Sequence, residues 1–288
     1  DTMNQGLLLV GIKRSERVAD NEHSYGYGHE RFIWALISAC GVFFVGAGIT
    51  IYKGITSLTH PTEVLLSPLI FIILIVSFFV EIVTLYIAYR ELKKNSRGAN
   101  FREMMRDGDP VTISVFYEDG VAVLGVLVAL LGITFSYYTN THYGDAISSI
   151  IIGLMLAWVA VTLINKNRDF LSGKAMPEDM KIELIELLES EPTIEKVVDF
   201  KSTTINIGVY SIKCEIEFNG SALLKEVRAA GGLRDDYEIA RENFPEFVRF
   251  CAEFIDRIPR LIGTKIDEIE KKIQTDFPEV KHIDIEIN

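Results

Sequence analysis

The segment VFYEDGVAVLGVLVALLG, residues 115–132, carries two adjacent acids at the start of a long apolar run. No charged residue occurs in the 25 positions from 120 to 144. A helix that crosses a bilayer needs about 20 such residues. Comparable runs cover 32–52, 64–89, where Glu81 is the single charge, and 146–165. The sequence therefore predicts four complete membrane spans, and Glu118 and Asp119 fall early in the one expected at 112–138.

The segments that flank these spans predict the orientation of the chain. The opening run, 2–12, is uncharged for only 11 residues, which predicts the second half of a membrane helix in an N-terminally truncated chain. Lys and Arg alternate between the connections, with four in 13–31, one in 53–63, six in 90–109, none in 138–145 and three in 166–174. This alternation predicts that the basic loops and the C-terminal part lie in the cytoplasm, or in the matrix of an organelle.

Composition separates a membrane domain, 1–174, from a soluble domain, 175–288. The first part carries 15 acidic and 14 basic side chains, and the second carries 25 and 15. A chain that is 49% apolar is not disordered, and a pI near 5.0 argues against a nucleic-acid binder. Three widely spaced cysteines predict no disulfide framework.

The soluble domain is expected to follow an α-β-β-α-β order. Helical spacing covers 178–190, and strand-like alternation covers 195–204, 207–218 and the C-terminal segment VKHIDIEI. A second helix is expected over 246–276, interrupted at Pro259. The stretch 219–245 is expected to be a charged helical insertion after the second strand.

Ionisable residues at membrane depth are costly and indicate a pathway or a binding site. The candidates are Asp1, Glu81, Glu118 and Asp119. Asn4 and Gln5 follow Asp1 by about one helical turn, on the same side of the helix. The alternative is that these acids are interfacial and reach headgroup water.

Four further stretches, in their order and spacing, resemble a known family. They are ADNEHSYGYGHERF (19–32), RELKKNSRGANFREMMRDGDP (90–110), YGDAISSIIIGLMLAWVAVTLI (143–164) and FPEVKHIDIEI (277–287). Together with 115–132 they resemble the cation diffusion facilitators, closest to the divergent branch of the mammalian mitochondrial zinc transporter numbered nine. The resemblance implies a bundle of six helices in the full protein, with the first missing here, and a small α+β ferredoxin-like cytoplasmic domain that forms a homodimer.

The same resemblance implies a tetrahedral metal site built from two His/Asp-xxx-Asp pairs. Asp1 and Asp119 match the second member of each pair, but Val115 occupies the partner position of Asp119 and cannot bind metal. Glu118 or Asn4 would supplement the transport site, and Glu81 would serve as a proton or metal relay.

Two further metal sites are weaker candidates. Asp20 and His23 match two ligands of a second metal site that bacterial relatives hold in this loop, with Tyr27 where a third, a His, would stand. In the soluble domain His282 and Asp284 lie on one strand face and are metal candidates, although a salt-bridged surface explains them equally.

The leading hypothesis is therefore a secondary transporter, and not an enzyme, in a bacterial inner membrane or an organelle inner membrane. It would export a divalent metal, zinc first with Mn²⁺, Fe²⁺ or Co²⁺ also tolerated, in exchange for protons and without a resident cofactor. One alternative is a membrane-anchored metal sensor or scaffold that transports poorly, which Val115 motivates. Another is an intramembrane hydrolase, which is disfavoured because HExxH and GxSxG motifs are absent from the sequence.

Overall fold

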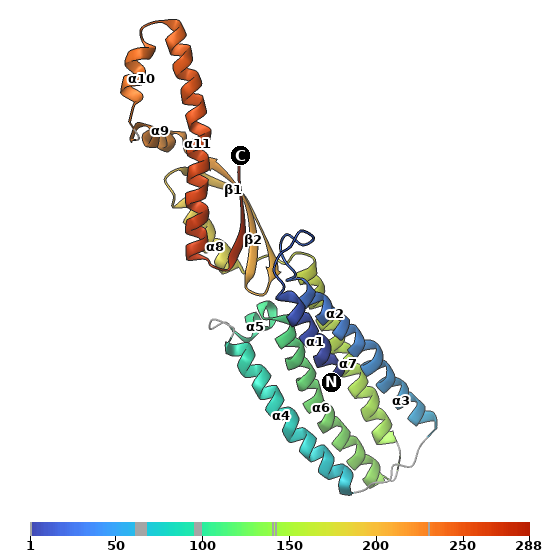
Figure 1. Ribbon diagram of the computed structural model, residues 1–288. Helices are drawn as coiled ribbons and strands as arrows, with labels where there is room; N and C mark the ends of the chain where they lie inside the picture. Colours follow the sequence, from blue (N-terminus) through green and yellow to red (C-terminus); the bar gives the residue numbers. More distant parts are fainter. Residues whose placement is uncertain (1, 61–67, 95–99, 140, 142, 230) are drawn as a thin grey trace. The chain divides into compact units, whose positions relative to one another are not determined.

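The computed structural model describes residues 2–60, 68–94, 100–139, 141, 143–229 and 231–288. These residues form two compact units, Asp1–Ser172 and Gly173–Asn288. The first is a helical bundle, and the second combines helices with a small β-sheet (Figure 1).

The first unit confirms the four predicted spans. A continuous helix runs over Glu30–Thr59 and consists of α2 (Glu30–Gly41), a π-helical segment η1 (Val42–Ala47) and α3 (Gly48–Thr59). The others are α4 (Pro68–Lys94), α6 (Pro110–Thr139) and α7 (Tyr143–Leu171). The opening run forms α1 (Thr2–Ser15), and a short helix α5 (Phe101–Asp107) precedes α6. Each span is long and apolar enough to cross a membrane, so the protein is a multi-pass membrane protein.

Small residues allow α7 to approach its neighbours closely. A Cβ atom added to Gly132 of α6 would lie 2.6 Å from the Gly144 carbonyl oxygen of α7, which no real Cβ contact permits. On the α3 side, a Cβ on Gly153 would meet the Ile51 backbone nitrogen at 3.0 Å. Close backbone approach through small residues is typical of helix packing in membranes, where apolar burial alone gives little driving force.

The second unit confirms the predicted α-β-β-α-β order. Helix α8 (Glu178–Glu189) leads into strands β1 (Ile194–Asn206) and β2 (Val209–Phe218), and the long helix α11 (Phe244–Asp276) precedes β3 (Val280–Ile287). The strand order is β1-β2-β3, with β1 and β2 antiparallel and β2 and β3 parallel. Leu188, Ile216 and Ile273 are fully buried where the helices cover one face of the sheet, so this unit has its own core.

The predicted interruption at Pro259 is wrong, because α11 continues through this residue. Proline removes one helical hydrogen bond, that to the carbonyl of Ile255. Pro259 lies on the exposed side of α11, where water can hydrate this carbonyl. Residues 219–245 include two short helices, α9 (Gly220–Ala229) and α10 (Leu233–Ala240), and an ion pair of 2.6 Å between Arg257 and Asp236 joins α10 to α11.

Candidate metal centre

The two adjacent acids of α6 point in different directions, as residues about 100° apart on a helix must. The Asn4 side-chain nitrogen on α1 donates a hydrogen bond of 2.5 Å to Oε2 of Glu118. The Ser38 hydroxyl on α2 in turn donates to Oδ1 of Asn4. Glu118 is thus the end of a polar chain that connects three helices. Its other oxygen, Oε1, is buried without a hydrogen-bond partner in the described structure.

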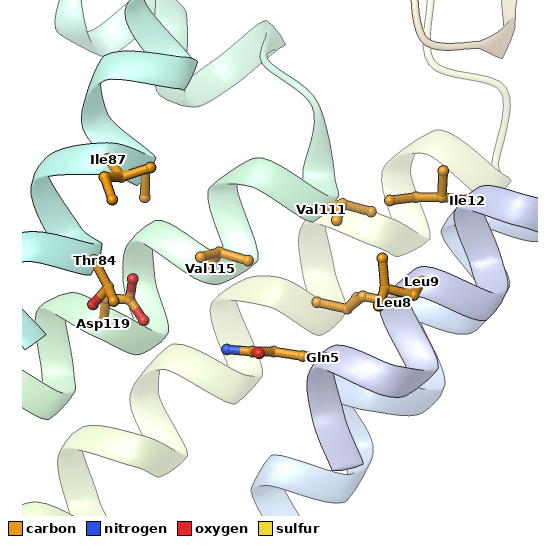
Figure 2. Close-up of a pocket in the computed structure, with 10 residues that line it drawn as sticks. Gln5, Leu8, Leu9, Ile12, Thr84, Ile87, Val111, Val115 and Asp119 are labelled. Atoms are coloured by element: carbon orange, nitrogen blue, oxygen red, sulfur yellow. The ribbon is translucent and has the colours of Figure 1, made fainter. Parts of the chain in front are cut away.

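Asp119 faces a separate cavity of about 350 Å³ (Figure 2). The side chain is 9% exposed, and its Oδ2 atom is buried with no hydrogen-bond partner among the described residues. The hydroxyl-bearing side chain of Thr84 on α4 lies beside the Asp119 carboxylate. The cavity is lined from three helices by Gln5, Leu8, Leu9, Ile12, Thr84, Ile87, Ala88, Val111, Val115 and Asp119.

Val115, one turn before Asp119, lines this cavity with methyl groups. It packs against a small core of Leu8, Ala35 and Val111, where α1, α2 and α6 meet. The residue that departs from the expected ligand pattern therefore has a packing role, and any further metal ligand must come from elsewhere.

The remaining membrane candidates are Asp1 and Glu81. Asp1 lies outside the described residues. Glu81 of α4 is partly exposed and close enough to Asp119 for the two carboxylates to repel each other. Among the described residues, no three His, Cys, Asp or Glu side chains are grouped so as to hold a metal ion. In the structure Glu118 is bound by Asn4, whereas Asp119 faces the cavity. The proposed set of metal ligands stays a prediction.

The loop candidates Asp20 and His23 do lie together, with His23 Nδ1 4.0 Å from Asp20 Oδ1. The same carboxylate also accepts backbone hydrogen bonds from Glu22 and His23, and the Tyr27 hydroxyl donates to it at 2.7 Å. This hydroxyl bond, followed by the backbone bonds, holds the pKa of Asp20 below its ordinary value. The interactions order the loop, and a metal role for Asp20 and His23 stays a prediction.

In the second unit, His282 and Asp284 lie on the strand face opposite the buried Cys214. Lys213 on the neighbouring strand contacts Asp284 at 3.6 Å and Glu286 at 2.5 Å. A lysine between two acids already balances part of their charge, which is the arrangement of a salt-bridged β surface. Metal binding by His282 and Asp284 is left as a prediction.

A partly buried ion pair lies at the start of α6 and was not predicted from the sequence. The Arg31 guanidinium of α2 contacts both carboxylate oxygens of Asp109, at 3.0 and 2.5 Å, and the two side chains are only 19% and 9% exposed. Asp109 also accepts a hydrogen bond of 3.1 Å from the backbone nitrogen of Val111, so it caps α6. The sequence signal for the cap is Asp followed by Pro110, since Asp at the N-cap and Pro at the first helical position are both favoured.

Comparison with known proteins agrees with this architecture. Residues 1–172 match the cation efflux transmembrane domain. The chain is 32% identical to metal tolerance protein C4 of Arabidopsis thaliana over 294 aligned residues. This alignment covers 99% of this chain and 64% of that protein. It is also 32% identical to the human protein named proton-coupled zinc antiporter SLC30A9, mitochondrial, over 296 aligned residues. This alignment covers 100% of this chain and 51% of that protein.

A more distant bacterial relative is the cation-efflux pump FieF of Cronobacter sakazakii, 24% identical over 195 residues, which cover 67% of this chain and 60% of that protein. The chain spans about half to two thirds of the length of the curated relatives named here. The domain match extends over more than half of the chain and includes all four apolar spans and the cavity. The chain therefore belongs to the cation efflux family, the cation diffusion facilitators.

Proposed function

We propose that this protein exports a divalent transition metal, zinc first, from the cytoplasm or an organelle matrix in exchange for protons. The observation that carries the proposal is the Asp119 carboxylate, which is buried at membrane depth with an unpartnered oxygen and faces a cavity between three helices. Such a group is costly in a membrane unless it serves a substrate. A human relative is named a proton-coupled zinc antiporter.

The chemistry of a carboxylate site links metal to protons directly. Metal and proton compete for the same oxygen, so metal affinity falls as the pH falls. Net exchange follows if the bundle alternates between conformations open to either side of the membrane around this site. Asp119, with Asp1, would form the core of the transport site, and Glu118, Asn4 or Glu81 would supplement it. Oxygen donors would also tolerate Mn²⁺, Fe²⁺ or Co²⁺.

The remaining elements of the proposal concern assembly and location. Asp20 and His23 would form a second metal site in the loop before α2. The protein would act as a homodimer in a bacterial inner membrane or in the inner membrane of an organelle, with the C-terminal unit in the cytoplasm or matrix. One relative is named as mitochondrial.

Flux measurements in proteoliposomes test this function. The purified chain is reconstituted, and Zn²⁺ movement is followed with an enclosed fluorescent indicator, with and without an imposed pH gradient. We expect flux that depends on the gradient and collapses in Asp119→Ala. Asp169→Ala is the matched control, because this α7 acid is exposed and pairs only with its neighbour Arg168 among the described side chains. Wild-type flux in Asp119→Ala would remove Asp119 from the mechanism.

A sensor or scaffold is the second candidate, because Val115 lines the cavity where a ligand was expected. The same preparation separates the two functions. Specific metal binding without flux in the unaltered protein would favour the sensor or scaffold, whereas flux driven by the pH gradient would exclude it.

A further inference from the structure

Gln5 brings a second type of oxygen donor to the cavity that Asp119 faces. Its side chain extends from α1 toward α6, and its amide is directed into the space in front of Val115 and Asp119 (Figure 2). Within the described part of the chain, the Gln5 amide makes no hydrogen bond. Gln5 is an exposed residue that lines the cavity, so its amide is free to bind a ligand that enters there.

The cavity contains few other polar groups. Seven of its ten lining residues are aliphatic, and the polar ones are Gln5, Thr84 and Asp119, one from each of α1, α4 and α6. Apolar walls exclude water and strengthen the attraction between a cation and the few oxygens that remain. The three polar side chains are an amide, a hydroxyl and a carboxylate, each of which can present an oxygen to a cation.

We propose that the amide oxygen of Gln5 is a ligand of the transported metal and replaces the ligand that Val115 cannot provide. This inference rests on the proposed function and concerns the same cavity. Asp119 supplies the negative charge, and Gln5 and Thr84 supply neutral oxygens. An oxygen donor set suits Mn²⁺ as well as Zn²⁺, whereas an imidazole in this position would favour Zn²⁺. Gln5 is therefore a specificity-determining residue of the transport site.

Metal binding to the purified chain in detergent tests this assignment without depending on transport. Equilibrium dialysis gives the Kd for Zn²⁺ and for Mn²⁺ in each variant. Gln5→Leu keeps the approximate size of the side chain and removes its oxygen. We expect both Kd values to rise about tenfold or more, because loss of even an outer-shell partner weakens metal sites about 10- to 100-fold. Val10→Ala is the matched control, since this exposed residue lies on the same helix, outside the cavity lining, and carries no donor.

Two substitutions that retain a donor keep the test informative if Gln5→Leu destabilises the bundle. Gln5→Glu converts the neutral oxygen to a charged one, and we expect tighter binding of both metals. Gln5→His replaces oxygen with nitrogen, and we expect the ratio of Mn²⁺ Kd to Zn²⁺ Kd to rise. Unchanged Kd values in Gln5→Glu and an unchanged ratio in Gln5→His would overturn the assignment.

Asp119→Ala separates failure of this inference from failure of the proposed function. If Asp119→Ala abolishes binding while all three Gln5 variants bind as the unaltered protein does, the inference fails and the proposed function stands. If Asp119→Ala itself binds both metals normally, the cavity is not the transport site, and both conclusions fail.

Discussion

Gly132 of α6 has no room for a side chain, and its replacement by alanine tests the packing of α6 against α7. An added Cβ would lie 2.6 Å from the Gly144 carbonyl oxygen and 2.9 Å from the Ser148 Cβ. Since the carbonyl belongs to the backbone, the two helices must move apart by several tenths of an ångström. Forced overpacking of this kind costs about 1–3 kcal/mol.

Gly125, two turns earlier on the same helix, provides the control. Its added Cβ would be 3.8 Å from the nearest atoms, on the side chain of Ile152, which is ordinary van der Waals contact. There the helix propensity of alanine dominates, which favours alanine over glycine by about 1 kcal/mol. The gain in helix propensity is common to both substitutions, so we expect Gly132→Ala to be less stable than Gly125→Ala by the overpacking cost, about 1–3 kcal/mol.

Thermal unfolding of the detergent-solubilised protein measures this difference. Both tryptophans, Trp34 and Trp158, lie in the first unit, so their fluorescence reports its unfolding alone. At about 2–4 °C per kcal/mol for a domain of this size, we expect Tm to be about 2–12 °C lower in Gly132→Ala than in Gly125→Ala. Equal Tm values for the two variants, or a higher Tm for Gly132→Ala, would refute the packing argument.

Three more measurements test other parts of the structure. Asp109→Ala leaves the partly buried Arg31 guanidinium without its partner and should destabilise the first unit by about 1.5–3 kcal/mol in the same assay; a loss below about 1 kcal/mol would equate the pair with exposed ones. The hydrogen bond from Tyr27 holds the pKa of Asp20 below 3.8, so the stability that this carboxylate gives its loop is present above pH 3.8 and is lost as the pH falls through the lower folded value. Tyr27→Phe should raise the Asp20 pKa toward 3.8 in a carbon-13 NMR titration, and an unaltered titration would contradict this. Burial raises the pKa of the Cys214 thiol to about 12, so maleimide at neutral pH should label Cys214 only after unfolding; rapid labelling of the folded protein would disprove its burial.

Features set by local sequence were predicted well. The four spans follow from runs of uncharged residues, and the α-β-β-α-β order follows from the period of apolar positions, so both can be found without knowledge of tertiary contacts. The hairpin between β1 and β2 also has a local signal. Gly208 adopts φ +65° there, a conformation that glycine reaches without a steric penalty.

Features that depend on contacts between distant residues were missed. The π-helical segment Val42–Ala47 has an ordinary apolar composition, so periodicity does not distinguish it from α-helix. Arg31 was counted only as a basic loop residue, because its partner Asp109 is 78 positions away. For the candidate site, the sequence indicated Asn4, Glu118 and Asp119 as polar groups at membrane depth. It did not show that Asn4 binds Glu118 and that Asp119 faces a different space.

We propose different roles for Glu118 and Asp119 because the two carboxylates point in different directions and contact different groups. A residue that releases its substrate in every cycle needs an oxygen that the protein does not already occupy, and Asp119 has one in the cavity. Glu118 also has an unpartnered oxygen, Oε1, but its Oε2 is bound by Asn4, and Glu118 does not line the cavity. Helix α1 contacts Glu118 through Asn4, and its next residue, Gln5, lines the cavity that Asp119 faces. Because Asn4 and Gln5 belong to one rigid helix, a displacement of α1 that widens the cavity also strains the hydrogen bond between Asn4 and Glu118, so access to Asp119 is linked to the polar chain that connects α1, α2 and α6.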